Sequence, residues 1–314
     1  MKAVSSRIPR PRWLSVGRQP HQADSDPNGD QAQILPRPHL GRYVSGVALI
    51  IAFLWAARGF ITNPNIDWAT VREYFGKDVI LGGVKNTLVM AFISMIIASV
   101  LGAGLAVLRL SGGPVWSAFS WTYTWFFRSV PLLVLIIFTG NFALLSDRLG
   151  ISVPFTSFYL ISVETNEVMT AFVASIVALS VHEAAYMSEI IRSGILSVPN
   201  GQKEAARALA IPGHKAFFLI ALPQAMRIII PPTGSTLINL IKATSLVSVI
   251  AGSELLTRVE NISATNLMTI ELLLVASLWY LLISSVTSVG QYFLERKYGR
   301  GYSSARELKI DSEV

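Results

Sequence analysis

The stretch EAARALAIPGHKAFFLIALP, residues 204–223, is a charged, mostly helical interruption between two apolar segments that are each long enough to cross a membrane. Asn200-Gly201 just before it is a turn signal, and good helix formers follow. Pro212-Gly213 ends this first helix before a second one begins. The sequence therefore predicts two short helices with a bend.

The first of these helices has features of a docking element. Glu204 and Arg207 are three residues apart, a spacing that predicts an ion pair on one helix face. The small side chains of Ala205, Ala206 and Ala208 leave the backbone accessible for close packing. We expect such a rigid stub to fit a groove on another protein. The alternative is a plain connector between two membrane helices.

The composition is that of a membrane protein. Of the 314 residues, 52% are hydrophobic and 14% are charged, and the mean hydropathy is +0.51. Soluble domains have about 25% charged residues. The chain contains no cysteine, which excludes disulfides, Cys-based metal sites and thiol nucleophiles. The net charge of +7 is compatible with nucleic acid, but in a membrane protein the location of the positive charge is more informative than its sum.

Apolar runs divide the chain into a tail and six expected crossings. Residues 1–42 are rich in Arg, Pro, Gln and Asp without a helical or strand period, which predicts a disordered tail. A crossing needs about 20 residues. The first is expected at 43–61 as a retained but marginal membrane helix. The others are expected at 86–108, 129–146, 168–191, within 216–256 and at 269–294, with residues 246–256 dipping into the bilayer.

Six crossings place both chain ends on one side, and the distribution of Lys and Arg indicates which side. With the amino terminus inside, the inner segments hold nineteen Lys and Arg and the outer loops hold four; without the tail the ratio is twelve to four. The sequence therefore predicts that both termini and the segment 204–223 are cytoplasmic. The inner segments are 1–42, 109–128, 189–227 and 295–314, and the outer loops are 61–82, 146–167 and 257–268.

Polar residues at membrane depth are candidates for a substrate path, because an ionised group there costs at least about 2.5–3.5 kcal/mol. Lys242 is placed to hold a substrate carboxylate and Glu271 an amino group. The alternative is that Lys242 pairs with Glu254 or reaches the headgroups, and that Glu271 lies at the outer interface. The full candidate set is Asn239, Lys242, Thr244, Ser245, Glu254 and Glu271.

Catalytic and metal motifs are missing from the sequence. His182-Glu183 begins a zinc-protease pattern, but the second histidine is replaced by Tyr186. Glu189 is expected to pair with Arg192 instead. The glycine-rich phosphate loop G-x-x-x-x-G-K-[ST] does not occur, so any ATP must bind another chain. We therefore expect no catalytic residues, no metal site and no nucleic-acid partner.

An ordered series of short motifs covers residues 80–296 and resembles the permease subunits of polar amino-acid ABC importers. The segment 204–223 is similar to the EAA loop of that family. The matching residues are Gly83, Asn86-Thr87-Leu88, Arg128, Pro131-Leu132-Leu133, Ala184-Ala185-Tyr186, Glu189-Ile190, Arg192, Gly194-Ile195, Ser197-Val198-Pro199, Gly201-Gln202, Glu204-Ala205-Ala206, Leu222-Pro223-Gln224-Ala225, Arg227, Ile230-Pro231-Pro232, Lys242, Thr244-Ser245-Leu246, Glu254-Leu255, Tyr280 and Leu294-Glu295-Arg296.

The resemblance implies an all-α integral membrane protein with the type I ABC importer permease fold, in a bacterial inner membrane. It implies a five-helix core at 80–296 with a coupling loop at 198–223, one extra helix at 43–61 and a cytoplasmic tail at 297–314. Two permease subunits, like or unlike, would face each other above two cytosolic ATPase subunits that bind ATP and Mg²⁺. A solute-binding protein would deliver the amino acid to the outer face. The residues expected to couple to the ATPase are Gly201, Gln202, Glu204, Ala205, Ala206, Arg207, Leu209 and Ala210.

The chain departs from the family pattern at three places. Ser129-Val130 replaces Gly-Thr after Arg128, and Ala243 stands where Asp is common. Ala210 stands where the family has glycine. If position 210 is helical, alanine is favoured there by about 1 kcal/mol; if it needs a positive φ, the docking geometry changes. The alternative function, an ion-coupled secondary transporter, would show two similar halves, and residues 43–165 and 166–296 show no such repeat.

Overall fold

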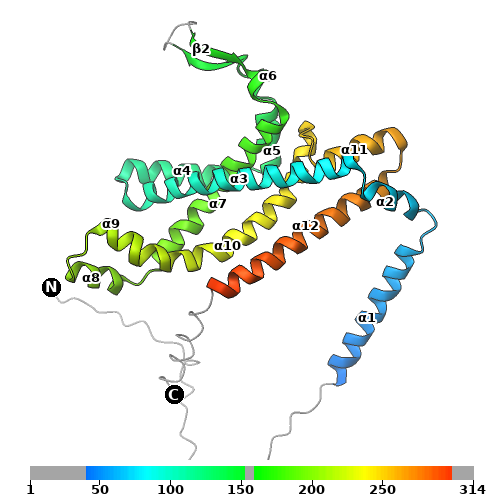
Figure 1. Cartoon of the computed structure of the whole chain (residues 1–314), viewed down its shortest axis with the longest axis horizontal. Helices are drawn as coiled ribbons and strands as arrows, with labels where there is room; N and C mark the ends of the chain where they lie inside the picture. The colour runs from blue at the N-terminus through cyan, green and yellow to red at the C-terminus, as the bar shows by residue number, and fades with distance from the viewer. Residues whose placement is uncertain (1–39, 153–158, 299–314) are drawn as a thin grey trace, which may run out of the picture. The chain divides into compact units, whose positions relative to one another are not determined.

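The computed structural model describes residues 40–152 and 159–298, and nearly all of its elements are helices (Figure 1). The tails predicted at 1–42 and 297–314 lie outside the described residues, except that helix already begins at Leu40 and continues to Tyr298. In chain order the elements are α1 (Leu40–Ile61), α2 (Trp68–Phe75), α3 (Asp78–Ser111), α4 (Pro114–Ser129), α5 (Leu132–Gly140), η2 (Phe142–Leu144), β1 (Arg148–Ser152), β2 (Tyr159–Glu164), α6 (Thr165–Val168), α7 (Ala171–Leu196), α8 (Asn200–Ala208), α9 (Gly213–Ala216), the π-helical turn η3 (Phe217–Ala221), α10 (Leu222–Ala243), η4 (Thr244–Ile250), α11 (Leu255–Asn266) and α12 (Thr269–Tyr298).

Helix α1 belongs to a unit of its own, Met1–Thr62. Its 22 residues correspond to about 33 Å of helix, enough for a hydrocarbon core of about 30 Å. The apolar part, Tyr43–Ile61, has a mean hydropathy of 2.0, and none of it is buried against protein. The structure thus contains the long apolar helix expected at 43–61.

The second unit, Asn63–Val314, contains the remaining candidate membrane spans. Three of them are the long helices α3, α7 and α12, and a fourth runs through Gly213–Ile250. The sequences of α3 and α12 have no polar stripe, as expected for helices surrounded by lipid and by one another. With α1, the described residues contain five long apolar helices, or six spans if α4 and α5 count as one.

The crossing expected at 129–146 is wrong in its bounds. Residues 114–129 form helix α4, although we expected an inner segment at 109–128, and α5 follows it at an angle of 97°. Pro131 explains the break, because it cannot donate a helical hydrogen bond and it favours an extended residue before it. Val130 has that extended backbone, with φ −79° and ψ 128°. Arg128 therefore lies at the end of a helix and not in a loop.

Two glycines allow α7 to pack closely against its neighbours. A Cβ on Gly102 of α3 would lie 2.7 Å from the Met187 Cβ and 2.9 Å from the Ser188 amide nitrogen. A Cβ on Gly194 would lie 2.4 Å from the Ile229 side chain of α10. Small residues at such crossings let helix backbones approach in a membrane, where the hydrophobic effect does not drive helices together. The core of the unit forms around these crossings, with Ala98, Leu179, Ile241 and Val275 among its buried members.

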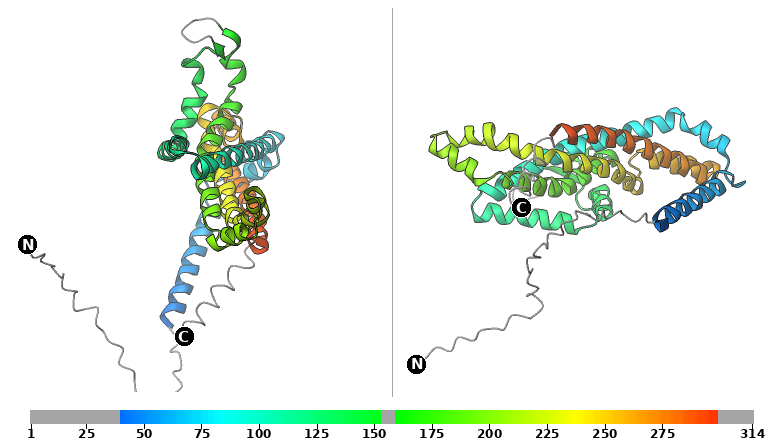
Figure 2. Two further views of the ribbon diagram at one scale, coloured as in Figure 1. Left: turned by 90° about the vertical axis from the view of Figure 1, so that its left-hand side faces the viewer. Right: turned by 90° about the horizontal axis from the view of Figure 1, so that it is seen from below.

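A β-hairpin lies at the end of the bundle where α6 and α5 lie (Figures 1 and 2). Strands β1 and β2 pair antiparallel, with Arg148 opposite Glu164 and Leu149 opposite Val163. Neither strand was predicted from the sequence, which had only an outer loop at 146–167. The all-α fold is confirmed, with this hairpin as an addition.

The short helix α2 starts with a side-chain cap. The Asp67 carboxylate accepts a hydrogen bond from the Thr70 hydroxyl at 2.7 Å and one from the Ala69 amide at 2.9 Å. These bonds, the one from Thr70 first, lower the pKa of Asp67.

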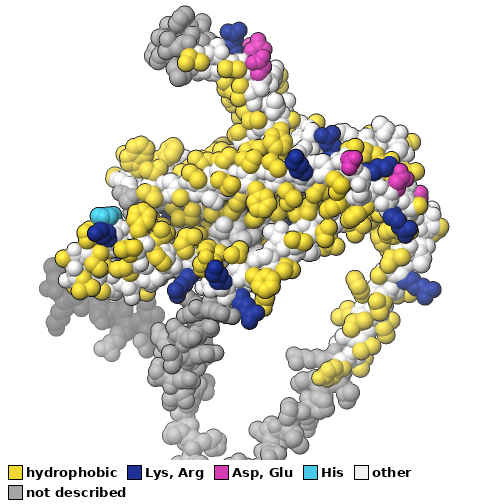
Figure 3. Space-filling model, in the orientation of Figure 1, with side chains coloured by type: hydrophobic (Ala, Val, Ile, Leu, Met, Phe, Trp, Pro, Cys, Tyr) yellow, Lys and Arg dark blue, Asp and Glu magenta, His cyan; other side chains and the backbone are white. Residues whose placement is uncertain are grey.

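Apolar side chains cover most of the visible face of the molecule, and charged side chains gather toward its ends (Figure 3). This distribution suits a protein that crosses a bilayer.

Candidate functional site

Helix α8 lies at the end of the bundle opposite to α2 and α11 (Figure 1). It begins after Pro199 and has nine residues, of which only Ala206 is buried. Glu204, Ala205 and Arg207 are exposed. A helix this short and this polar is marginal by itself, so its position depends on its two ends and on the contact that Ala206 makes. The two short helices predicted from the sequence are present as α8 and α9.

The carboxyl end of α8 is closed by a left-handed residue. The Ile211 amide donates to the Ala206 carbonyl, and the Ala210 amide donates to the Arg207 carbonyl, both at 2.9 Å. This pair of bonds is a Schellman motif, which needs a positive φ at the position occupied by Ala210. Ala210 has a φ of 51°, a conformation that costs a non-glycine residue about 1–2 kcal/mol. The interpretation of position 210 as helical is therefore wrong, and the positive-φ alternative holds.

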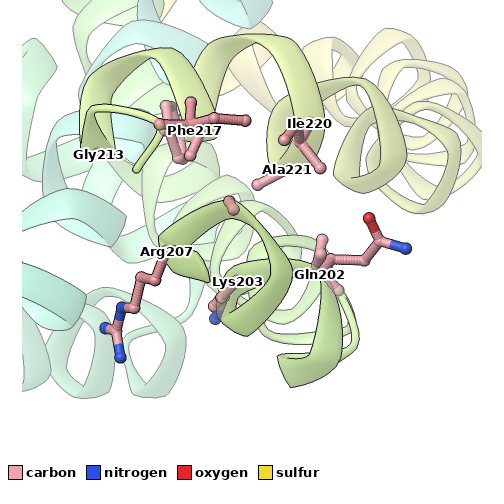
Figure 4. A pocket seen from close by; sticks show the side chains of 11 residues that line it. Gln202, Lys203, Arg207, Gly213, Phe217, Ile220 and Ala221 are labelled. Atoms are coloured by element: carbon pink, nitrogen blue, oxygen red, sulfur yellow. The ribbon is translucent and has the colours of Figure 1, made fainter. Parts of the chain in front are cut away.

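A pocket of about 420 Å³ separates α8 from the start of the next membrane helix (Figure 4). Phe217, Ile220 and Ala221 form one wall, and α8 forms the other (Figure 4). The side of α8 that faces the pocket carries Gln202, Lys203, Ala206 and Arg207. The lining is apolar at its base and polar along the α8 rim. The arrangement suits insertion of a side chain from another protein.

The ion pair expected between Glu204 and Arg207 does not form, because neither of the two salt bridges among the described residues involves them. Both side chains are exposed, and an exposed pair at this spacing gains at most about 0.5 kcal/mol. The Arg207 side chain extends away from the pocket wall formed by Phe217 and Ile220 (Figure 4). Of the eight residues expected to couple to a partner, three line the pocket, namely Gln202, Ala206 and Arg207. The others, Gly201, Glu204, Ala205, Leu209 and Ala210, are exposed.

The residues predicted for a substrate path do not form one cluster. Asn239 and Lys242, three residues apart on α10, have exposed side chains. Thr244 is buried, and its hydroxyl donates to the Ile241 carbonyl at 2.7 Å. The Ser245 hydroxyl donates to the Lys242 carbonyl at 2.8 Å. Of these four residues, Asn239 and Lys242 are the ones with exposed side chains.

The two carboxylates of the predicted path have other contacts. Glu254 is fully buried at the start of α11 and accepts four hydrogen bonds. Its donors are the Thr257 amide and hydroxyl at 2.7 and 3.0 Å, the Leu256 amide at 2.7 Å and the Tyr280 hydroxyl at 2.7 Å. It forms no salt bridge with Lys242, against one of our alternatives. Glu254 therefore acts as a helix cap that also joins α11 to α12.

Glu271 lies near the start of α12, where its carboxylate accepts a hydrogen bond from the Asp67 amide at 3.2 Å. The alternative that Glu271 lies at the outer interface stays a prediction. Our sequence reasoning missed Tyr280 as the partner of Glu254, although Tyr280 was one of the matching residues. The pair expected between Glu189 and Arg192 is present, at 2.7 Å.

The family model described as binding-protein-dependent transport system inner membrane component matches residues 98–300. The chain belongs to this family. The match includes α7, the α8–α9 loop and α10, so it contains the exposed loop described above. The resemblance to ABC importer permeases is thereby confirmed, and the protein is an integral membrane permease subunit of an ABC transporter. A secondary carrier is not favoured.

Curated relatives of this permease cover most of its length. It is 39% identical over 277 residues to the arginine transport system permease protein ArgU of Corynebacterium glutamicum, which covers 87% of this chain and 86% of that protein. It is 34% identical to the L-cystine transport system permease protein TcyB of Bacillus subtilis, over 75% of this chain and 92% of the relative. It is 34% identical to the nopaline transport system permease protein NocM of Agrobacterium fabrum, over 71% of this chain and 88% of that relative.

Solved structures give the same fold. The crystal structure of an amino acid ABC transporter with histidines superposes with a TM-score of 0.63 at 25% identity, and covers 74% of this permease and 99% of that chain. An inward-facing form of the MetNI methionine ABC transporter superposes with a TM-score of 0.52 at 19% identity, and covers 70% of this permease and 96% of that chain. At that identity the second match concerns the fold alone.

Proposed function

We propose that this permease forms the translocation path of an ATP-driven importer of a polar amino acid or a related small solute. The observation that carries the proposal is the exposed α8 helix with its apolar pocket, held at one end of the membrane helices by α7 and α10. A cytosolic pair of ATPase subunits, which binds ATP and Mg²⁺, would engage this surface. The permease itself carries out no catalytic step.

The charge distribution supports the orientation. The α8–α9 loop and both chain ends have the excess of Lys and Arg that is typical of cytoplasmic segments. Placing α8 in the cytoplasm puts α2, α11 and the hairpin outside, where a solute-binding protein would dock. We therefore place both termini in the cytoplasm of a bacterial cell, with the permease in its inner membrane.

The exposed polar groups of α10 support a second permease subunit. Lys242 is a cation in the last turn of α10, within the apolar span Gly213–Ile250, and its side chain is exposed in the single chain. Ionisable residues at membrane depth face a bundle interior or a water-filled path, and not lipid. A like or related permease facing α10 would enclose Lys242 and Asn239 in such a path. Lys242 would then attract the carboxylate of an amino acid.

The class of solute rests on the relatives. Three of them are named for the transport of arginine, L-cystine and nopaline, which share an amino-acid carboxylate. The free cation of Lys242 matches that common group. We infer a polar amino acid as the solute and leave its side chain open.

A charge reversal on α8 tests the proposal. Glu204→Lys should abolish amino-acid uptake and the co-purification of the ATPase, while the amount of permease in the membrane stays unchanged. Glu260→Lys, the same change on exposed α11 at the other end of the bundle, should leave ATPase co-purification intact. Lys242→Ala should keep the ATPase but weaken the apparent affinity for solute. Wild-type uptake by Glu204→Lys would remove α8 from the coupling surface.

A further inference from the structure

A second cavity lies between α3, α4 and α7, away from the α8 pocket. Its volume is about 460 Å³, and three arginines from three different helices line it: Arg109, Arg128 and Arg192. A single carboxylate, that of Glu189, is present among the residues that line it. The cavity therefore has a surplus of positive charge in a part of the chain that is otherwise apolar.

The surplus is not cancelled by neighbouring groups. Glu189 already pairs with Arg192 through two hydrogen bonds of 2.7 and 2.9 Å. The Arg128 guanidinium lies over the Tyr186 ring at 5.2 Å from its centroid, a contact that leaves its charge unneutralised. Arg109 has no ion pair among the described residues. The guanidinium groups of Arg109 and Arg128 thus face the cavity without a carboxylate paired to either of them.

The position of the cavity along the helices matches the level of lipid headgroups. Arg109 lies in the last turn of α3, and Arg192 lies four residues before the end of α7. The two helices run in the same direction, because the Ser94 hydroxyl contacts the Ile176 carbonyl and Gly102 lies against Met187 further along. Both arginines therefore lie close to the same membrane surface. Arg128 can reach this level from deeper in the membrane, because arginine extends its head toward the interface.

An exposed aromatic pair borders the arginines. Trp121 and Trp125 stack with ring centroids 6.2 Å apart, and their exposed fractions are 52% and 57%. Ser120 and Thr124, each next to one of these tryptophans in the same helix, are buried against the bundle. Trp is enriched at the membrane–water interface because its ring is apolar and its N–H is polar. The pair gives the cavity an apolar border on which acyl chains can lie.

We propose that this cavity binds the phosphate of an anionic phospholipid headgroup, in the leaflet on the same side as α8. Arg109 and Arg128 supply the unpaired positive charge, Arg192 is oriented by Glu189, and the Trp121–Trp125 pair contacts the glycerol and upper acyl region. Basic pockets between membrane helices on the cytoplasmic side recognise anionic headgroups in this way. The proposal is independent of the transported solute and of ATPase docking.

Lipid titration of the delipidated, full-length permease tests it by native mass spectrometry. Phosphatidylglycerol should bind at lower concentrations than phosphatidylcholine. Arg109→Gln should weaken phosphatidylglycerol binding about fivefold, the effect of one basic side chain near an anionic surface. Arg296→Gln removes an exposed charge from the last turn of α12 and controls for general attraction to the lipid. Arg109→Lys, which keeps the charge, should retain most of the affinity.

A fluorescence measurement on the wild-type fold avoids any loss of folding in the arginine variants. Phosphatidylglycerol with brominated acyl chains should quench tryptophan emission more than brominated phosphatidylcholine does. Replacement of Trp121 and Trp125 by Phe should remove that difference.

Four results would overturn the proposal. These are equal binding of the two lipids by the wild type, an equal loss in Arg109→Gln and Arg296→Gln, and displacement of phosphatidylglycerol by millimolar inorganic phosphate, which would assign the site to a free anion. The fourth is loss of lipid binding on assembly of the permease pair, which would assign the surface to subunit contact.

Discussion

Two of the turns in this permease that place residues other than glycine in the left-handed conformation are stabilised in different ways. Between η4 and α11, in a turn that we call the outer turn after the orientation proposed above, Ala251 and Ser253 have φ values of 55° and 62°. At the other end, Ala210 has a φ of 51° after α8. The outer turn is tied to distant helices by side chains, whereas the turn after α8 is closed by two bonds within its own backbone.

The outer turn is part of a long-range network. The Asn86 amide donates to the Ser253 carbonyl at 2.9 Å, and the Leu255 amide donates to the Thr87 hydroxyl at 3.2 Å. Glu254 adds its contact to Tyr280 on α12. Three helices are thereby joined at one point. The α8 turn has no such side-chain connection to a distant helix among the described residues.

The largest effect is expected at the centre of the outer network. Glu254→Ala removes the cap of α11 and leaves the buried Tyr280 hydroxyl without its acceptor, which together should cost about 3 kcal/mol. Glu254→Gln keeps one acceptor oxygen and should cost less. Thermal unfolding of the purified permease measures both. Equal stability of Glu254→Ala and wild type would show that the outer turn is as locally stabilised as the α8 turn.

Alanine substitutions of two glycines compare the room for a Cβ at the two ends of the helix bundle. A Cβ on Gly83 would lie 2.9 Å from the Leu255 Cα, a backbone atom that cannot turn aside, so Gly83→Ala should destabilise the protein by about 1–3 kcal/mol. A Cβ on Gly201 meets nothing within 4 Å, and Gly201→Ala in α8 should be neutral or stabilising by up to about 1 kcal/mol. The two substitutions should shift the melting temperature in opposite directions, or by clearly different amounts. Two equal losses would contradict the difference in packing.

The smallest effect is expected at Ala210. Glycine adopts the left-handed conformation without the Cβ clash, but it also gains freedom in the unfolded chain, so Ala210→Gly should stabilise the α8 turn by about 0.5–1 kcal/mol. Protection of the Ala210 and Ile211 amides from hydrogen exchange should rise, with little change at Leu255. A decrease in protection at Ile211 would mean that the Schellman motif is not what closes α8.

The sequence predicted those features of the fold that depend on residues close together in the chain. Pro212-Gly213 separated α8 from α9, and the apolar runs located α3, α7 and α12, although α3 extends to Asp78 and α12 to Tyr298 beyond the expected bounds. Pro131 was visible as well, but its consequence was not: we read residues 129–146 as one crossing instead of a helix pair with a sharp bend.

What the sequence did not predict depends on residues far apart in the chain. The role of Glu254 follows from Tyr280, 26 residues away, and the neighbouring Leu255 amide is bonded to Thr87 of α3, 168 residues away. The hairpin lay unrecognised because its strands are short and are separated by a stretch without a recognised turn signal. The positive φ of Ala210 results from the cap at the end of α8. The helix propensity of alanine gives no indication of such a cap. The candidate substrate residues as a set stay a prediction.

The two glycine crossings give α7 a mechanical property. Gly102 of α3 and Gly194 of α7 bring three helix backbones too close for sliding, and α8 follows Leu196 after a link of only three residues. A force applied to α8 therefore cannot be absorbed by slack in the loop. We expect it to act on α7 and, through the close contacts at Gly102 and Gly194, to move α3 and α10 with it.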